Sequence, residues 1–231
     1  MEDVLTLTLV AWVSLTLAFA SALLIVVDEV RHPQRMAVMN IVWPISALYF
    51  SVFAVWAYLR IGRKKAKDAA MGSMNSTGKN APPTPAQVAV GTSHCGAGCT
   101  VADVCTEFGI AASGLVLFGS VLWTEYLLDF VVAWAVGIAF QYFAIKPMRD
   151  DLSPAGAVWA AIKADTLSIT AFQIGMYAWM ALVYYRLFAA PHLTPFEPRY
   201  WFMMQIAMIC GFATSYPMNR FLIGRGLKEK M

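Results

Sequence analysis

The chain of 231 residues contains 59% hydrophobic and only 13% charged residues, and its formal net charge is +3. A soluble domain has roughly 45–50% apolar and about 25% charged residues, so this composition excludes an ordinary soluble domain. The small net charge gives no sign of nucleic-acid binding. The sequence predicts an all-α, polytopic transmembrane helical bundle, in which spans of roughly 20 residues use most of the chain.

Two apolar segments without charged residues open the chain, residues 4–27 and 36–59. The short polar link between them predicts a transmembrane helical hairpin. Glu2 and Asp3 are acidic where a secretory signal would be basic, which favours a retained anchor, with a cleaved signal as the alternative. The basic cluster at residues 60–67 belongs in the cytoplasm by the positive-inside rule, and two crossings place the N-terminus there too.

Small polar residues and three closely spaced prolines fill residues 68–92, which predicts a flexible cytoplasmic linker. The chain is thereby divided into an N-terminal hairpin, residues 1–67, the linker, and a four-helix transmembrane domain, residues 93–231. In this domain we place one span ending near Leu122, a break at residues 123–126, and further spans at residues 127–145, 158–185 and 200–223. About six spans, arranged as two plus four with both termini cytoplasmic, put nearly all Lys and Arg on one side.

The segment His94-Cys95-Gly96-Ala97-Gly98-Cys99 holds two of the four cysteines and one of the three histidines. Thiolate and imidazole are ligands for Cu(I) and Zn(II), and the two glycines would let the backbone fold so that the sulfur atoms converge. We therefore predict that His94, Cys95 and Cys99 form a metal site. A redox pair, or two inert thiols in a tight loop, are the alternatives.

A helix that already begins near Cys95 would place Cys95, Cys99, Asp103 and Glu107 on one face, because they are four residues apart. Such a stripe could lead a cation inward. In the alternative interpretation, Asp103 and Glu107 lie in a first helical turn, where negative charge suits the helix dipole.

Two methionine pairs occupy the last two predicted spans, Met176 with Met180 and Met204 with Met208. Antiparallel packing would bring Met180 to the depth of Met204 and Met176 to that of Met208, in two tiers ~6 Å apart. Thioethers bind Cu(I) weakly enough to pass it on, so these residues are predicted to line its path. Methionine as an adaptable core filler is the alternative.

Polar groups inside spans usually face a bundle interior or a cavity. Lys163 and Asp165 lie near the cytoplasmic end of their span and are expected to snorkel, whereas Asp129 lies near the external end of its own. Three glutamines lie deeper and are expected to hydrogen-bond between helices. The intramembrane polar candidates are Asp129, Gln141, Asp165, Gln173 and Gln205.

Several segments together, 93–99, 137–142, 164–168, 175–177 and 201–205, resemble a bacterial membrane family known as domain of unknown function 4396. The resemblance covers about Ser93 to Met231 and leaves the first two helices outside. It implies a multi-pass protein of the bacterial cytoplasmic membrane, and it implies no reaction.

The leading hypothesis is a membrane protein that binds or transports a soft metal ion, with copper as Cu(I) the expected ion. The alternatives are a membrane thiol redox protein that uses Cys95 and Cys99, and a non-catalytic membrane assembly subunit. No nucleotide-binding, zinc-protease or Ser-His-acid pattern is present, so a familiar hydrolytic or nucleotide-using enzyme is not expected. The expected partners are the lipid bilayer and the metal ion, and a homo-oligomer or a membrane partner stays open.

Overall fold

A computed structural model of the chain describes residues 2–34, 36–63, 82–146 and 152–228. Within these residues the fold is all-helical and contains no β-strand, which confirms the all-α part of the predicted fold class. Most of the predicted linker and half of the basic cluster, residues 64–81, lie outside the described residues.

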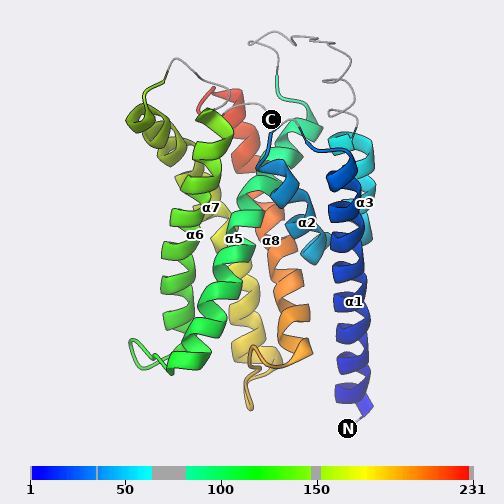
Figure 1. The fold of residues 1–231 in the computed structure, drawn as a ribbon. Coiled ribbons are helices and arrows are strands. Elements are labelled where there is room, and N and C mark those ends of the chain that lie inside the picture. Colours follow the sequence, from blue (N-terminus) through cyan, green and yellow to red (C-terminus); the bar gives the residue numbers. More distant parts are fainter. Residues whose placement is uncertain (1, 35, 64–81, 147–151, 229–231) are drawn as a thin grey trace.

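Five long helices run side by side along the height of the bundle (Figure 1). Three segments are long and apolar enough to cross a membrane: α1, α6, and α7 together with the π-helical turn η3 that continues it. The other two, α5 and α8, carry more polar side chains, many of which are buried inside the bundle. The bounds are α1 Glu2–Arg31, α5 Pro85–Ser113, α6 Val121–Ile145, α7 Pro154–Leu182, η3 Val183–Leu187 and α8 Pro198–Gly224.

The connection between α5 and α6 differs from the prediction. Gly114, with φ of 64°, ends α5 in the left-handed conformation, and Gly119, with φ of 69°, turns the chain just before α6. Such conformations suit glycine because it has no Cβ. The predicted break at residues 123–126 is wrong, because these residues lie inside α6.

The second predicted span, residues 36–59, is not one helix. α2 (Met39–Phe50) ends at Ser51, whose φ of 50° breaks the helix, and α3 (Val52–Ala57) continues into the π-helical turn η1 (Tyr58–Gly62). Figure 1 shows α2 and α3 beside α1 in one half of the bundle, both short of the other end.

α3 and η1 run back toward the C-terminal end of α1, beside which α2 begins. Tyr58 Oη donates a hydrogen bond to Asp28 Oδ2 (2.7 Å), and Arg63 forms an ion pair with Asp28 (3.2 Å). At the tip, the rings of Phe50 and Phe212 pack edge to face with centroids 4.9 Å apart. α2 and α3 therefore form a helical hairpin whose tip packs against α8.

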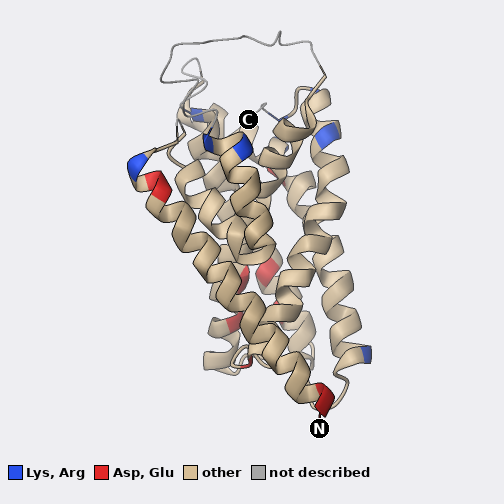
Figure 2. Ribbon diagram, turned by 90° about the vertical axis from the view of Figure 1, so that its right-hand side faces the viewer, with Lys and Arg blue, Asp and Glu red and all other residues tan. Residues whose placement is uncertain are grey.

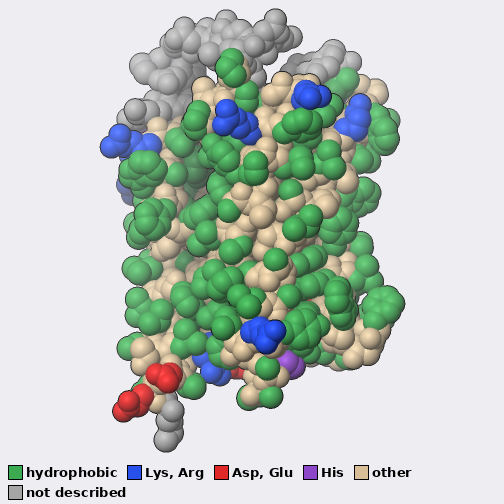
Figure 3. Space-filling model, turned by 180° about the vertical axis from the view of Figure 1, so that it is seen from behind, with side chains coloured by type: hydrophobic (Ala, Val, Ile, Leu, Met, Phe, Trp, Pro, Cys, Tyr) green, Lys and Arg blue, Asp and Glu red, His purple; other side chains and the backbone are tan. Residues whose placement is uncertain are grey.

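Charged residues are distributed unevenly between the ends of the bundle. The N- and C-termini lie at opposite ends of the bundle (Figure 1). The end where α8 finishes is called the basic end below. The end where α1 begins is called the far end. Figure 2 shows Lys and Arg mostly toward the basic end, and among the described basic residues only Arg186 and Arg199 lie nearer the far end. Hydrophobic side chains cover much of the face between the ends (Figure 3).

Candidate functional site

α5 is the central helix of the bundle and is buried on all sides from residue 90 to residue 100. A capping box starts it, because the Thr84 hydroxyl accepts from Gln87 N (3.3 Å) while Gln87 Oε1 accepts from Thr84 N (2.9 Å). The helix begins at Pro85, inside the segment predicted as a linker. The last of the three prolines, Pro85, therefore starts a helix rather than only interrupting one.

The glycines of the 94–99 segment admit neighbouring helices rather than bending the backbone into a loop. A Cβ at Gly96 would lie 2.7 Å from Tyr49 Oη and 3.1 Å from the ring of Phe172, and one at Gly98 would lie 3.4 Å from the Cα of Gly137. The hairpin tip, α6 and α7 therefore approach the backbone of α5 closely at this point. The predicted loop that would bring the sulfur atoms together does not form, because residues 94–99 lie inside a continuous helix.

The six predicted sulfur-bearing side chains, from three helices, share one contiguous hydrophobic core, to which Met203 of α8 also belongs. All six are buried, and the Thr100 hydroxyl oxygen lies 3.7 Å from Met208 Sδ, a contact that joins α8 to α5. We call this set the sulfur cluster. Its members are Cys95 and Cys99 from α5, Met176 and Met180 from α7, and Met204 and Met208 from α8.

The predicted stripe on α5 is present, because Cys95, Cys99, Asp103 and Glu107 all lie within one continuous helix and are all buried. The first-turn alternative for the two acids is wrong, since the helix starts 18 residues before Asp103. Neither oxygen of Asp103 has a hydrogen-bond partner, and Oε2 of Glu107 has none either.

His94 does not join the two cysteines. On a helix its side chain points about 100° away from that of Cys95, and its ring packs edge to face with Phe140 (centroids 5.9 Å apart). The described residues contain no group of three or more His, Cys, Asp or Glu side chains that could hold a metal ion. The predicted set of His94, Cys95 and Cys99 is therefore not assembled in this structure.

Asp165 was expected to snorkel, but it is fully buried and forms an ion pair with Lys228 (2.8 Å), which is also buried. Lys228 Nζ also donates to Ser168 Oγ (3.4 Å), and Asn219 Nδ2 donates to the same hydroxyl (2.8 Å). Lys163, two residues from Asp165, is exposed and lies over the ring of Trp159. The charged groups of α7 therefore differ in role, and only Lys163 behaves as expected.

The remaining polar candidates are all buried but differ in their partners. Thr106 of α5 donates to the carboxylate of Asp129 on α6. Gln205 bridges three helices as expected, since Ser14 donates to its Oε1 (2.7 Å) and its Nε2 donates to Leu48 O (2.6 Å). The amide groups of Gln141 and Gln173 have no hydrogen-bond partner, so the predicted interhelical role is met by one glutamine of three.

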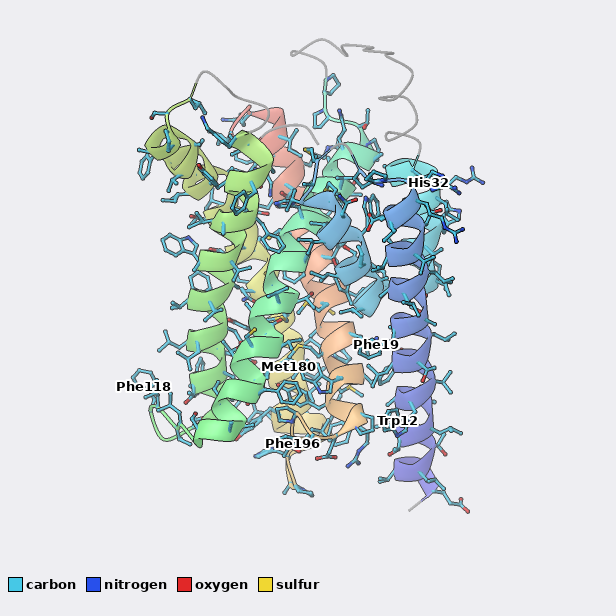
Figure 4. The ribbon with its side chains drawn as sticks, in the orientation of Figure 1. Trp12, Phe19, His32, Phe118, Met180 and Phe196 are labelled. Atoms are coloured by element: carbon cyan, nitrogen blue, oxygen red, sulfur yellow. The ribbon has the colours of Figure 1, made fainter. Side chains whose placement is uncertain are left out.

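Two cavities open beside the stripe of α5. The first, about 370 Å³, is lined by Glu107 and Met180 together with Glu125 and Tyr200. The second, about 490 Å³, is lined by Asp103 together with Met204 and Met208. The predicted methionine tiers therefore do not share one cavity, because Met180 lines the first cavity while Met204 and Met208 line the second. Figure 4 labels Met180 inside the bundle.

Two residues of the site were not found by sequence reasoning. Tyr49 belongs to α2, outside the four-helix domain predicted from the sequence, yet its side chain is part of the core that holds the sulfur cluster. Lys228 belongs to a short basic tail that looks like an ordinary cytoplasmic anchor. No local pattern marks either residue, because both contacts depend on how distant segments pack.

A comparison with protein-family models matches residues 85–228, more than half of the chain, to a family described as Domain of unknown function (DUF4396). The match starts at the first residue of α5 and ends at Lys228, so the N-terminal helices lie outside it. Neither the curated proteins nor the solved structures gave a match to this chain.

Proposed function

Since the chain belongs to the family described as Domain of unknown function (DUF4396), whose description assigns no activity, we propose from its own residues that it is a membrane protein that binds and passes Cu(I). The observation that carries this proposal is the sulfur cluster. Two thiols and four thioethers from three helices are buried in one core, at the centre of the most buried helix of the bundle.

The donor set suits Cu(I) better than Zn(II). Thiolate and thioether are soft ligands that select Cu(I), whereas a structural zinc site has four ligands drawn from Cys, His, Asp and Glu. The described residues hold no group of even three such side chains. Cys95 and Cys99 are the proposed binding residues, and the four methionines are the proposed weaker ligands; His94 is not included.

The two cavities support an approach to this cluster from the far end. One leads to Met180 past Glu107, and the other leads to Met204 and Met208 past Asp103. Carboxylates attract a cation, and the thioethers would then hold it at the level next to the thiols. At the basic end, the buried pair of Asp165 and Lys228 closes the bundle.

We further infer five membrane crossings and one re-entrant hairpin, in place of six spans with both ends inside. The basic end then faces the cytoplasm by the positive-inside rule, and the start of α1 faces the outside. A hairpin of two short helices is tolerated at membrane depth because protein covers it on several sides. The proposed location remains the bacterial cytoplasmic membrane.

Cysteine labelling distinguishes the two topologies. In a background without native cysteines, we expect a cysteine at Glu2 to react with a membrane-impermeant maleimide from the same side as one at His192. A cysteine at Thr84 should react only from the opposite side. These three positions are exposed. If Glu2 instead labels together with Thr84, the chain crosses an even number of times and the re-entrant assignment fails.

Copper binding tests the proposed function directly. We expect the purified full-length chain, kept reduced, to bind about one Cu(I) in competition with a chromophoric chelator. Replacing both Cys95 and Cys99 by Ser should weaken this binding by at least about tenfold, because the only thiolate ligands of the cluster are lost.

Two matched controls separate ligand loss from general damage. Cys105 lies on the same helix but is exposed, so Cys105→Ser should leave binding unchanged. Met39 and Met204 are equally buried, at 5% exposure, but Met39 belongs to a different core cluster. Met204→Leu should therefore weaken binding more than Met39→Leu. Binding of less than one Cu(I), or binding that is indifferent to the cysteine pair, would refute the proposal.

The geometry of α5 disfavours the thiol redox alternative. Side chains four residues apart on an intact helix have Cβ atoms about 5–6 Å apart, and a disulfide needs about 3.5–4.5 Å. Oxidising Cys95 and Cys99 to a disulfide would therefore distort α5 where it is packed most closely.

A further inference from the structure

The second cavity lies between α1, the hairpin tip, α5 and the start of α8. The hairpin extends only partway along α1, and the space beyond its tip is bounded by Leu48 and Tyr49 on one side and by Pro195 and Phe196 on the other. Figure 4 labels Trp12 and Phe19 on α1 and Phe196 below α8, which are three of its lining residues. A volume of about 490 Å³ is in the range of small-molecule sites.

Almost every polar side chain around this cavity already has a partner. The Tyr49 hydroxyl donates to Ser46 Oγ (3.4 Å), and the Thr100 hydroxyl donates to Gly96 O (2.8 Å). Gln205 is held by Ser14 and Leu48, and Glu197 forms an ion pair with Arg199.

Asp103 is the exception. Its carboxyl group is fully buried, lines the cavity, and has no partner at either oxygen. No Lys, Arg or His side chain among the described residues forms an ion pair with it. Glu107, one turn further along α5, is also buried but lines the first cavity. A buried carboxylate without a partner is costly, so a bound cation with N–H donors would stabilise this arrangement.

We propose that this cavity binds a small amphipathic organic cation, with an amine head on Asp103 and an apolar body against the aromatic wall. A single unpaired carboxylate, in a pocket whose other polar side chains already have partners, fits one cationic head and a body without further polar groups. The aromatic rings of Trp12, Phe108 and Trp201 supply that wall. This cavity is also the proposed approach for Cu(I) to Met204 and Met208, but neither thiol of the copper site, Cys95 or Cys99, lines it.

Paired probes of one shape test this proposal without copper. Naphthylmethylamine carries the amine head and naphthalenemethanol is its neutral counterpart, and both are titrated calorimetrically into the purified full-length chain. We expect the amine to bind at least about tenfold more tightly than the alcohol. In Asp103→Asn this preference should disappear. Asp129→Asn should retain it, because Asp129 is equally buried but does not line the cavity.

A second variant tests the cavity itself. Leu15 lines it from α1, and Leu15→Trp should fill it and weaken binding of both probes while leaving Asp103 unchanged. Equal binding of amine and alcohol, an amine preference that survives in Asp103→Asn, or failure of both probes to bind the wild-type chain would each overturn the proposal. None of these outcomes bears on the proposed function, which stands or falls on Cu(I) binding by Cys95 and Cys99.

Discussion

Lys228→Met is expected to destabilise the protein by about 3–5 kcal/mol, because it leaves a buried charge without its partner. The ion pair with Asp165 has a separation of 2.8 Å, and both side chains are fully buried. Removing the ammonium group leaves a carboxylate in the bundle interior, where one of its oxygens already has no partner. Gly137 packs against that oxygen, since a Cβ at position 137 would lie only 3.0 Å from it.

A double-mutant cycle separates the interaction energy of the ion pair from the effect of each residue alone. It is measured by unfolding of the purified chain in detergent. Asp165→Asn alone should also destabilise strongly, whereas Lys228→Met combined with Asp165→Asn should recover much of the loss, because no unpaired charge remains. Lys163→Met is the matched control, since this lysine lies two residues from Asp165 but is exposed; it should change stability by no more than about 0.5 kcal/mol. Additive single effects would show that the two charges do not interact in the folded protein.

Local signals in the sequence were sufficient to locate the later helices. The predicted spans 127–145, 158–185 and 200–223 lie within or close to α6, α7 with η3, and α8, because apolar runs bounded by polar and proline-rich connections mark them clearly. The stripe on α5 also followed from spacing, given a helix that has already begun at Cys95, because side chains four residues apart share a helical face.

Long-range packing decided what the sequence could not show. The hairpin break at Ser51 has no glycine or proline beside it, and both limbs are apolar, so the segment looks like one continuous span. His94 was grouped with Cys95 and Cys99 because the glycines suggested a loop, and a continuous α5 separates them. The glycines at positions 114 and 119, in contrast, are a local signal that could have located the α5–α6 turn correctly.

A close approach of α7 and α8 predicts the second large effect. A Cβ at Gly175 of α7 would meet Thr214 Oγ1 and would lie 2.6 Å from Cys210 O, and one at Gly211 of α8 would lie 2.6 Å from the ring of Phe172. Small residues at such crossings let helix backbones approach within a membrane. Gly175→Val should therefore destabilise the protein by about 3 kcal/mol, because α8 has to move away.

The same substitution links packing to the proposed copper site. Gly175 precedes Met176, and its contact residue Cys210 follows Met208 by two positions, so separating α7 from α8 moves thioethers of both helices away from Cys95 and Cys99. Cu(I) binding should fall together with stability in Gly175→Val. Gly109→Ala is the matched control, because a Cβ there would meet no atom within 4 Å; it should stabilise α5 by about 0.5–1 kcal/mol and leave copper binding unchanged. If the Gly175→Val chain loses stability but binds Cu(I) as tightly as the wild type, the thioethers are not copper ligands. The two thiols would then be the only proposed ligands left.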